Sequence, residues 1–130
     1  LELPEAITIA IYRITQEALT NAIQHAQASE VLVRLTQYPN ELRLTIHDDG
    51  CGIPGITGRV RRFGRDADEG EYDLSRFVEQ SHFGLAGMFE RAKMIGAQLE
   101  VYSAKDYGTA VILVVPNDTL LPDPAHAHLP

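Results

Sequence analysis

The sequence predicts an α+β fold, a two-layer α/β sandwich in which helices cover one face of a mixed, mostly antiparallel sheet. Two segments carry apolar residues every three to four positions, which is the spacing of amphipathic helices. Two pairs of short segments alternate apolar and polar residues and are joined by turns, as antiparallel hairpins with one buried face are. The order helix, hairpin, long loop, helix, hairpin is sufficient for one two-layer domain.

The first helix is expected to begin at Pro4, because proline is tolerated in a first helical turn, and to extend to about Ala26. Its apolar stripe consists of Ile7, Ile11, Ile14, Ala18 and Ala22, with Ile23 at the margin. A second stripe, spaced four residues apart, is polar although it borders the apolar one; it consists of Arg13, Glu17 and Asn21. This arrangement indicates a functional face.

The first hairpin follows this helix. Alternation predicts a strand at residues 31–36, with Val31, Val33 and Leu35 on a strongly buried face. Pro39 and Asn40 suit a turn, and apolar residues at positions 42, 44 and 46 predict the partner strand. We therefore expect two antiparallel strands, the second of which ends at Asp48.

Residues 54–82 show no periodic pattern, and a loop of this length inside a domain is either functional, such as a lid, or disordered. Within it, residues 74–78 are compatible with a short helix. A second helix is expected at residues 84–95, with Gly96 as its C-cap, and two last strands at residues 99–101 and 110–115. The domain is therefore expected to span residues 1–116, followed by a tail or linker at residues 117–130.

Composition narrows the function. The chain has 130 residues and a formal net charge of −7, which argues against a nucleic-acid binder but leaves nucleotides possible, because a metal and backbone amides can neutralise phosphates. Cys51 is the only cysteine, so no internal disulfide can form. No apolar run is long enough to span a membrane. We expect a cytoplasmic domain without membrane contact, excised from a longer protein because its first residue is not Met.

Glu17 and Asn21 lie one helical turn apart, close enough to contact one ligand. A carboxamide oxygen is a hard donor that suits Mg²⁺, and the neighbouring carboxylate can orient or deprotonate a nucleophile. The alternative is that Glu17 pairs with Arg13 while Asn21 faces water.

The second candidate segment begins with Asp48, whose carboxylate can accept a hydrogen bond from an exocyclic amine such as that of adenine. Gly50 and Gly52 would let the backbone approach a planar ring; the alternative is an ordinary Asp-Gly turn. Gly84 and Gly87 stand at a helix N-terminus, which can cradle phosphate or act as a hinge.

These segments together resemble the ATP-binding catalytic domain of bacterial two-component sensor histidine kinases, in particular the nitrate-sensor-like subfamily. That domain belongs to the superfamily of gyrase-type ATPases, Hsp90 chaperones, histidine kinases and MutL-type repair proteins. Tyr-Arg-Ile-Thr-Gln-Glu-Ala-Leu-Thr-Asn-Ala at residues 12–22 is similar to the N box, and Asp-Asp-Gly-Cys-Gly-Ile at residues 48–53 to the first glycine box. Gly-Leu-Ala-Gly-Met-Phe-Glu-Arg-Ala at residues 84–92 is similar to the second glycine box, and Gly108-Thr109 completes the set.

The resemblance covers about residues 4–116 apart from the loop, and it departs from the family pattern in three places. Gln24 stands where many relatives carry lysine, and Ser-His-Phe at residues 81–83 replaces a segment that often contains glycine. The loop at residues 54–82 is also longer than this subfamily leads us to expect.

The resemblance implies a Bergerat-type fold that binds ATP with Mg²⁺. It implies that Asn21 coordinates Mg²⁺, that Glu17 is the catalytic residue beside the γ-phosphate, and that Asp48 binds the adenine amine, supported through water by Thr109. The further nucleotide contacts that it implies are Gly50, Gly52, Gly84, Leu85, Gly87 and Met88, with residues 54–82 as an ATP lid.

The reaction that the resemblance implies is transfer of the γ-phosphoryl group to a histidine on a separate dimerisation domain of the same parent protein. A response regulator would be an indirect partner, and the isolated domain is expected to be a monomer. Two alternatives stay open: a related ATPase or anti-sigma-type serine kinase, and a degenerate, non-catalytic interaction module. Failure to bind adenine nucleotides would favour the interaction module.

Overall fold

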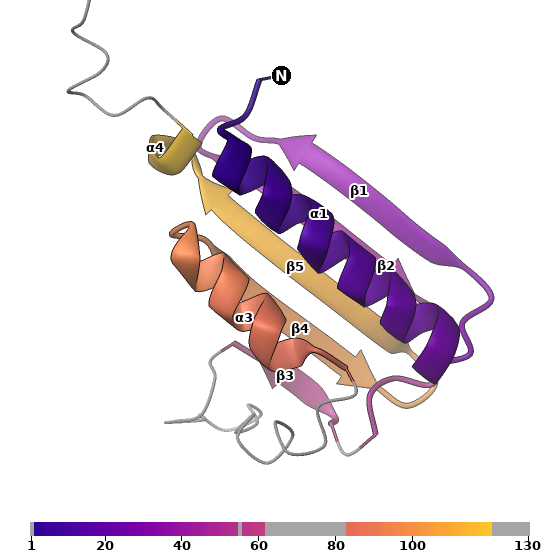
Figure 1. The fold of residues 1–130 in the computed structure, drawn as a ribbon. Coiled ribbons are helices and arrows are strands. Elements are labelled where there is room, and N and C mark those ends of the chain that lie inside the picture. The colour runs from indigo at the N-terminus through magenta and orange to yellow at the C-terminus, as the bar shows by residue number, and fades with distance from the viewer. Residues whose placement is uncertain (1, 55, 62–82, 121–130) are drawn as a thin grey trace, which may run out of the picture.

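The computed structural model describes residues 2–54, 56–61 and 83–120, which form a two-layer sandwich (Figure 1). One layer is a sheet with the strand order β1-β2-β5-β4-β3, in which each neighbouring pair is antiparallel. The strands are β1 (Val31–Gln37), β2 (Glu41–Asp48), β3 (Gly58–Val60), β4 (Gln98–Ala104) and β5 (Gly108–Pro116). The predicted α+β sandwich is confirmed.

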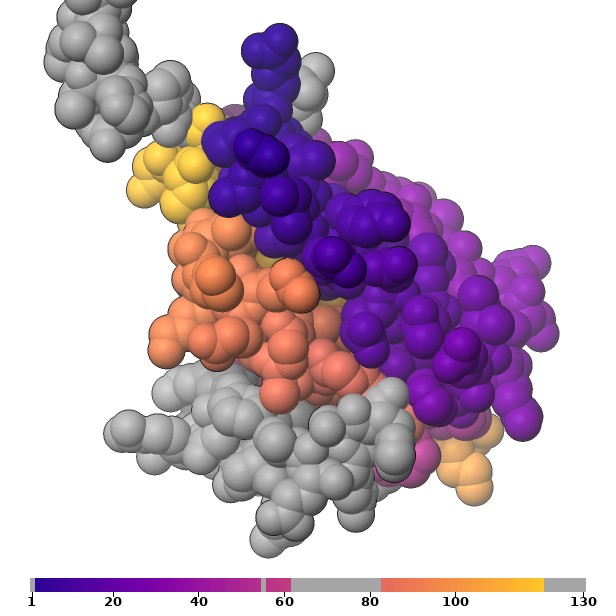
Figure 2. Space-filling model, in the orientation of Figure 1, coloured from indigo at the N-terminus to yellow at the C-terminus, as the bar shows by residue number. Residues whose placement is uncertain are grey.

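Helices α1 (Glu5–Thr20) and α3 (Leu85–Met94) form the second layer, on the same face of the sheet. The space-filling view shows the two helices lying against each other along that face (Figure 2). The prediction of a second helix that ends at Gly96 is confirmed, because Gly96 follows α3 with a φ of +70° and its N–H donates to Lys93 O.

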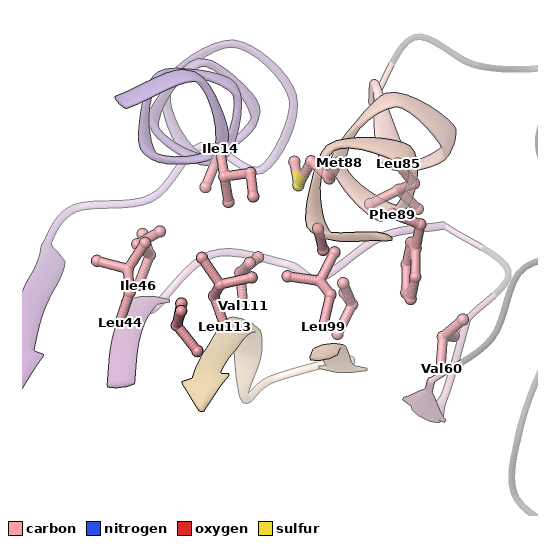
Figure 3. Close-up of a cluster of buried hydrophobic side chains, with 14 of the residues drawn as sticks. Ile14, Leu44, Ile46, Val60, Leu85, Met88, Phe89, Leu99, Val111 and Leu113 are labelled. Carbon is pink, nitrogen blue, oxygen red and sulfur yellow. The ribbon is translucent and has the colours of Figure 1, made fainter. Parts of the chain in front are cut away.

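The core lies between the helices and the sheet (Figure 3). Ile14 of α1 and Met88 of α3 pack over Leu44, Leu99 and Leu113 of the sheet, and each of these side chains is at most 4% exposed. Burial of an apolar side chain of this size contributes about 1.5–3 kcal/mol, so this layer fixes both helices on the sheet.

The first helix changes form at Asn21. Residues Asn21–His25 make a π-helical turn, η1, in which the N–H of Ala26 donates to Asn21 O over 3.0 Å. Such turns are rare and occur frequently at functional sites. The predicted extent of the helix is confirmed, but the widened turn was not predicted.

The predicted burial of β1 is wrong. Val33 is 44% exposed and Leu35 is 47% exposed, although both share the helix-facing side of the sheet with their β2 partners Ile46 and Leu44. The reason is position: β1 is at the end of the sheet, and α1 packs on β2 beside it. Ile23 is also exposed, at 71%, because it lies on the side of the helix opposite to the core.

The prediction of a structureless segment from residue 54 is wrong at its beginning, because Gly58–Val60 forms β3 and pairs with β4. The predicted helix at residues 74–78 and most of the predicted lid lie outside the described residues. After Pro116, residues Asn117–Leu120 form a short helix, α4, and Leu120 packs against the core. None of the described helices combines the length and apolar character needed to cross a membrane.

Candidate functional site

The ends of four elements meet at one end of the sandwich: the C-terminal ends of α1 and β2, and the N-terminal ends of β5 and α3 (Figure 1). Asn21, at the end of α1, donates to the main chain of Phe83 just before α3. Asp48, the last residue of β2, lies directly opposite Thr109 of β5. The fold therefore brings the residues of the three predicted motifs together, although they are far apart in the sequence.

Asn21 has a buried polar atom without a protein partner. Its side chain is 9% exposed, and Nδ2 donates to Phe83 O over 2.7 Å. This bond fixes the orientation of the amide, since only the nitrogen can donate to a carbonyl. Oδ1 is buried and has no hydrogen-bond partner among the described residues, and an orphan acceptor of this kind costs about 1–3 kcal/mol. A hard cation is a chemically suitable partner for such an oxygen.

His25 borders the same place. Its ring lies 5.0 Å from the ring of Phe83, centroid to centroid, in an edge-on arrangement. The π-helical turn thus places His25 and Asn21 against Phe83, just before α3.

Glu17 is partly buried, one turn before Asn21, and Gly84 lies against its carboxylate. A Cβ at Gly84 would collide with that carboxylate, and Gly84 has a φ of +62°, which disfavours any other residue. No ion pair joins Glu17 to Arg13 or to another described residue, so the alternative of a Glu17–Arg13 pair is not realised. The start of α3 therefore packs directly on the carboxylate of Glu17.

Asp48 is 6% exposed, and its Oδ1 accepts a hydrogen bond from Gly50 N over 2.8 Å. The second carboxylate oxygen has no hydrogen-bond partner in the described parts of the chain, which leaves an acceptor for a ligand. Thr109 is 7% exposed beside it, and Gly108 lies so close to the main chain of Asp48 that a Cβ would clash there. A neutral amine that donates to Asp48 would complete this arrangement.

The turn at residues 48–52 is attached to the elements around it. Cys51 N donates to Ala26 O over 3.0 Å, and Gly50 packs so tightly on Ala26 that an added Cβ would lie within 2.6 Å of its methyl carbon. Position 50 therefore requires glycine because of close packing, whereas position 52 favours glycine because its φ is +79°. The sequence had predicted backbone freedom for both glycines.

Sequence reasoning missed Ser103. This residue is fully buried in β4, and its Oγ accepts a hydrogen bond from Ile53 N over 2.7 Å, which ties the residue after the glycine turn to the sheet. A signal was present, because Leu99, Val101 and Ser103 occupy successive inward positions of one strand, and serine interrupts the apolar pattern.

Asp49 was also not selected from the sequence. Its Oδ1 accepts hydrogen bonds from Ser29 N over 2.7 Å and from Glu30 N over 3.0 Å. The backbone N–H groups of Glu30 and then Ser29 hold the pKa of this carboxyl below its ordinary value of 3.8, because they stabilise the charged form. Asp49 therefore binds residues 29–30, just before β1, as a carboxylate.

Two predicted contacts do not reach the site with their side chains. Leu85 and Met88 are buried in the core at 4% and 2% exposure, and Met88 N already donates to Gly84 O. Gly87, in contrast, is exposed in the first turn of α3, with open space where a Cβ would stand. A separate hollow of about 880 Å³ bounded by α3, β4 and β5 contains none of the candidate residues.

Comparison with known proteins gives the same classification throughout. Residues 6–119 match the family model of histidine kinase-, DNA gyrase B- and HSP90-like ATPases. The chain is 30% identical over 117 residues to the nitrate/nitrite sensor protein NarX of Escherichia coli K12, a match that covers 89% of this chain and 16% of NarX. It is 33% identical over 116 residues to the histidine-protein kinase/phosphatase DegS of Brevibacillus brevis, covering 89% of this chain and 25% of DegS.

Solved structures support the same family. The histidine kinase domain of the blue-light activated histidine kinase EL346 of Erythrobacter litoralis matches with a TM-score of 0.59 and 29% identity, over 92% of this chain and 52% of that one. The ATP-binding domain of PrrB from Mycobacterium tuberculosis matches at 20% identity with a TM-score of 0.55, which supports the fold. The chain spans 16% and 25% of NarX and DegS. On this basis it belongs to the histidine kinase-, DNA gyrase B- and HSP90-like ATPase family, among relatives that are sensor kinases.

Proposed function

We propose that this chain is the ATP-binding catalytic domain of a sensor histidine kinase, which binds Mg-ATP and transfers the γ-phosphoryl group to a histidine on a separate domain. The observation that carries the proposal is the buried Oδ1 of Asn21, which has no hydrogen-bond partner among the described residues. It lies at the same end of the sandwich as the Asp48 carboxylate oxygen to which no described residue donates. One offers a ligand for a hard cation and the other an acceptor for an amine. Mg-ATP contains both a hard cation and an exocyclic amine.

At the adenine end, the free oxygen of Asp48 accepts the hydrogen bond of the exocyclic amine, with Thr109 beside it to hold a bridging water. The turn at Gly50 and Gly52 lines the base, and its attachment to Ala26 and Ser103 keeps the turn in place. Because Asp48 is almost fully buried, a hydrogen bond from an amine to its carboxylate is stronger here than in water.

At the phosphate end, Asn21 Oδ1 holds Mg²⁺ together with oxygens of the phosphates, and the bound ion neutralises their charge. Glu17, one turn away, lies where it can orient the acceptor imidazole and take its proton. Gly84, Leu85 and Gly87 approach the phosphates through the backbone at the start of α3, where the first N–H groups of a helix have no helical partner. Met88, the last predicted contact of this segment, has its side chain in the core and its N–H bonded to Gly84 O.

The acceptor histidine belongs to a helical domain of the parent protein in this proposal, and a response regulator is the indirect partner. The isolated domain is a monomer in the cytoplasm, where ATP is available. The relatives NarX and DegS are a sensor protein and a histidine-protein kinase/phosphatase by name, which supports this assignment.

The test is calorimetric titration of the domain with ATP and ADP, with and without Mg²⁺, beside Asp48→Asn. We expect both nucleotides to bind the parent domain, ATP more tightly with Mg²⁺, and Asp48→Asn to weaken binding about tenfold or more, as the loss of a charge-assisted hydrogen bond does. Asp118→Asn is the matched control, because it removes the same charge from an exposed residue of α4. A folded domain that binds no adenine nucleotide would refute the proposal and support the non-catalytic interaction module.

A further inference from the structure

Asp49 connects two parts of the site that the chain does not connect directly. Its neighbour Asp48 points into the site, whereas Asp49 is exposed and its Oδ1 accepts hydrogen bonds from Ser29 N and Glu30 N. In return, Asp49 N donates to Glu30 O over 3.3 Å. The last residue of β2 and the residue after it thus face in opposite directions, Asp48 toward the ligand position and Asp49 toward a loop.

That loop, residues 26–30, joins η1 to β1, so it follows directly on the turn that carries Asn21. The same loop receives Cys51 N at Ala26 O. Asp49 therefore binds the later half of the loop, and Cys51 binds its beginning. Between them they hold the end of the first helix against the turn that follows Asp48.

We propose that Asp49 is a positioning residue for nucleotide binding: by holding residues 29–30 against the glycine turn, it sets the separation between Asn21 and the free oxygen of Asp48. The inference rests on the function proposed above and adds to it a residue that does not touch the nucleotide. A ligand that bridges Asp48 and Asn21 binds tightly only if both groups are held at the distance that the ligand requires, because ordering them on binding would reduce the affinity.

The surroundings of Asp49 favour its charged form. Charge-assisted hydrogen bonds from backbone N–H groups to a carboxylate are stronger than bonds to a neutral acceptor. The ionisable neighbours are His47 and Asp48 at the end of β2 and Glu30 on the loop. Asparagine at position 49 would keep an acceptor oxygen in place, whereas alanine would remove it.

The experiment measures affinity for Mg-ATP and for the Mg complex of purine riboside triphosphate, which lacks the exocyclic amine. Asp49→Ala is expected to weaken the binding of Mg-ATP about tenfold and to weaken the binding of the analogue less. The ratio of the two affinities therefore falls. A coupling of this size is ordinary for residues that act through one another. Asp49→Asn is expected to restore most of the affinity. In an Asp48→Asn background, Asp49→Ala is expected to have a much smaller effect, because the adenine contact is already lost.

Asn117→Ala is the matched control. The side chain of Asn117 also forms a hydrogen bond to a loop, because its Nδ2 donates to Pro39 O over 2.5 Å. Asn117 follows the C-terminal end of β5, whereas Thr109 lies at the N-terminal end of that strand. Its replacement should leave both affinities unchanged. If Asp49→Ala does not fold, Asp49→Glu keeps the charge on a longer side chain and is expected to show the same loss of discrimination.

The outcomes separate the two proposals. If the parent domain binds ATP and the Asp49 variants bind both nucleotides as it does, the positioning role is refuted and the proposed function stands. If the effect of Asp49→Ala is additive with Asp48→Asn, Asp49 does not act through the adenine contact, and the inference is likewise overturned. If the folded parent domain binds neither nucleotide, both proposals fail.

Discussion

At the scale of single residues, Asn21 combines a hydrogen bond with an unsatisfied buried acceptor. Its amide nitrogen gains one hydrogen bond to Phe83 O, while its oxygen is buried without a described partner. A typical hydrogen bond contributes about 0.5–1.5 kcal/mol, and an unsatisfied buried acceptor costs about 1–3 kcal/mol. Without a ligand, Asn21 therefore contributes little to the stability of the fold or reduces it.

This balance gives a prediction for Asn21→Ala. Because the substitution removes the bond and the orphan oxygen together, the free energy of unfolding without ligand should change by less than about 1 kcal/mol. The dependence of nucleotide affinity on Mg²⁺ should be lost. Urea denaturation and titration with ATP, in Mg²⁺ or in EDTA, measure the two effects. A variant that is strongly destabilised but keeps its Mg²⁺ dependence would show that Asn21 is a structural residue.

Asp49 gives a prediction for pH. Its pKa is lowered in the folded protein from the ordinary value of 3.8, chiefly by the N–H groups of Glu30 and Ser29. Its contribution to stability is thus present above that ordinary value and is lost as pH falls through the lowered one. In Asp49→Asn, the free energy of unfolding should decline less steeply below about pH 4 than in the parent protein.

Urea midpoints measured from pH 7 to pH 3 test this prediction, with Asp118→Asn as the control. Asp118 is exposed on α4, and its carboxylate accepts no hydrogen bond from a described residue. The control should retain the slope of the parent protein. Parallel curves for Asp49→Asn and the parent protein would mean that the bonds to residues 29–30 do not persist in solution.

At the scale of elements, local periodicity predicted type and order well. Both helices and both hairpins follow from patterns of three to four or two residues, because these patterns reflect what one element buries. Three features depend on distant parts of the chain and were missed. The strand at Gly58–Val60 has no pattern of its own and exists by pairing with β4, and Ser103 matters because Ile53 meets it. The widening of the helix at Asn21 has no periodic signal.

The error at β1 has the same origin. Alternation tells which residues share a face, but it does not tell whether a helix covers that face. Leu35 and Leu44 are direct partners in the β1–β2 ladder, yet Leu35 is 47% exposed and Leu44 is 2% exposed. The position of a strand in the sheet, which is a property of the whole fold, determines the difference.

These two leucines form a matched pair for a stability prediction. Leu44→Ala should lower the free energy of unfolding by about 2–5 kcal/mol, because it leaves a cavity in the core. Leu35→Ala should cost less than about 1 kcal/mol, since much of that side chain already contacts water. Urea denaturation of the two variants measures the difference. Equal losses would show that another surface covers β1 in solution, and sedimentation would then test whether that surface is a second copy.

The residues of the candidate site could also be predicted from the sequence only in part. Asn21, Glu17, Asp48 and Thr109 could be selected from the sequence because their polar types interrupt apolar patterns or resemble family motifs, and the fold brings all four to one end of the sandwich. Leu85 and Met88 were selected by motif alone, and their side chains belong to the core. A motif identifies a backbone segment, whereas burial decides which of its side chains remain free.

At the scale of the whole molecule, the proposed reaction is divided between two bodies. In that proposal, this domain carries the residues that bind the nucleotide, and the acceptor imidazole must be brought to Glu17 from another domain. A bimolecular arrangement makes transfer dependent on docking, so the rate should follow the concentration or tethering of the acceptor domain. Nucleotide binding, in contrast, should be a property of this domain alone.

The last prediction follows from that division. With labelled ATP and Mg²⁺, the isolated domain should acquire no phosphohistidine, and addition of the helical acceptor domain from the parent protein should produce an acid-labile phosphoryl group on the acceptor. Glu17→Gln should slow transfer about tenfold to a hundredfold and change ATP affinity less than about threefold, because an interaction made only in the transition state affects the rate and not binding. Gln16→Ala, an exposed neighbour on the same helix, is the control. If Glu17→Gln weakened binding and transfer equally, Glu17 would act on the bound nucleotide in its ground state. Phosphohistidine on the isolated domain would instead contradict the separation of the two bodies on which the proposal depends.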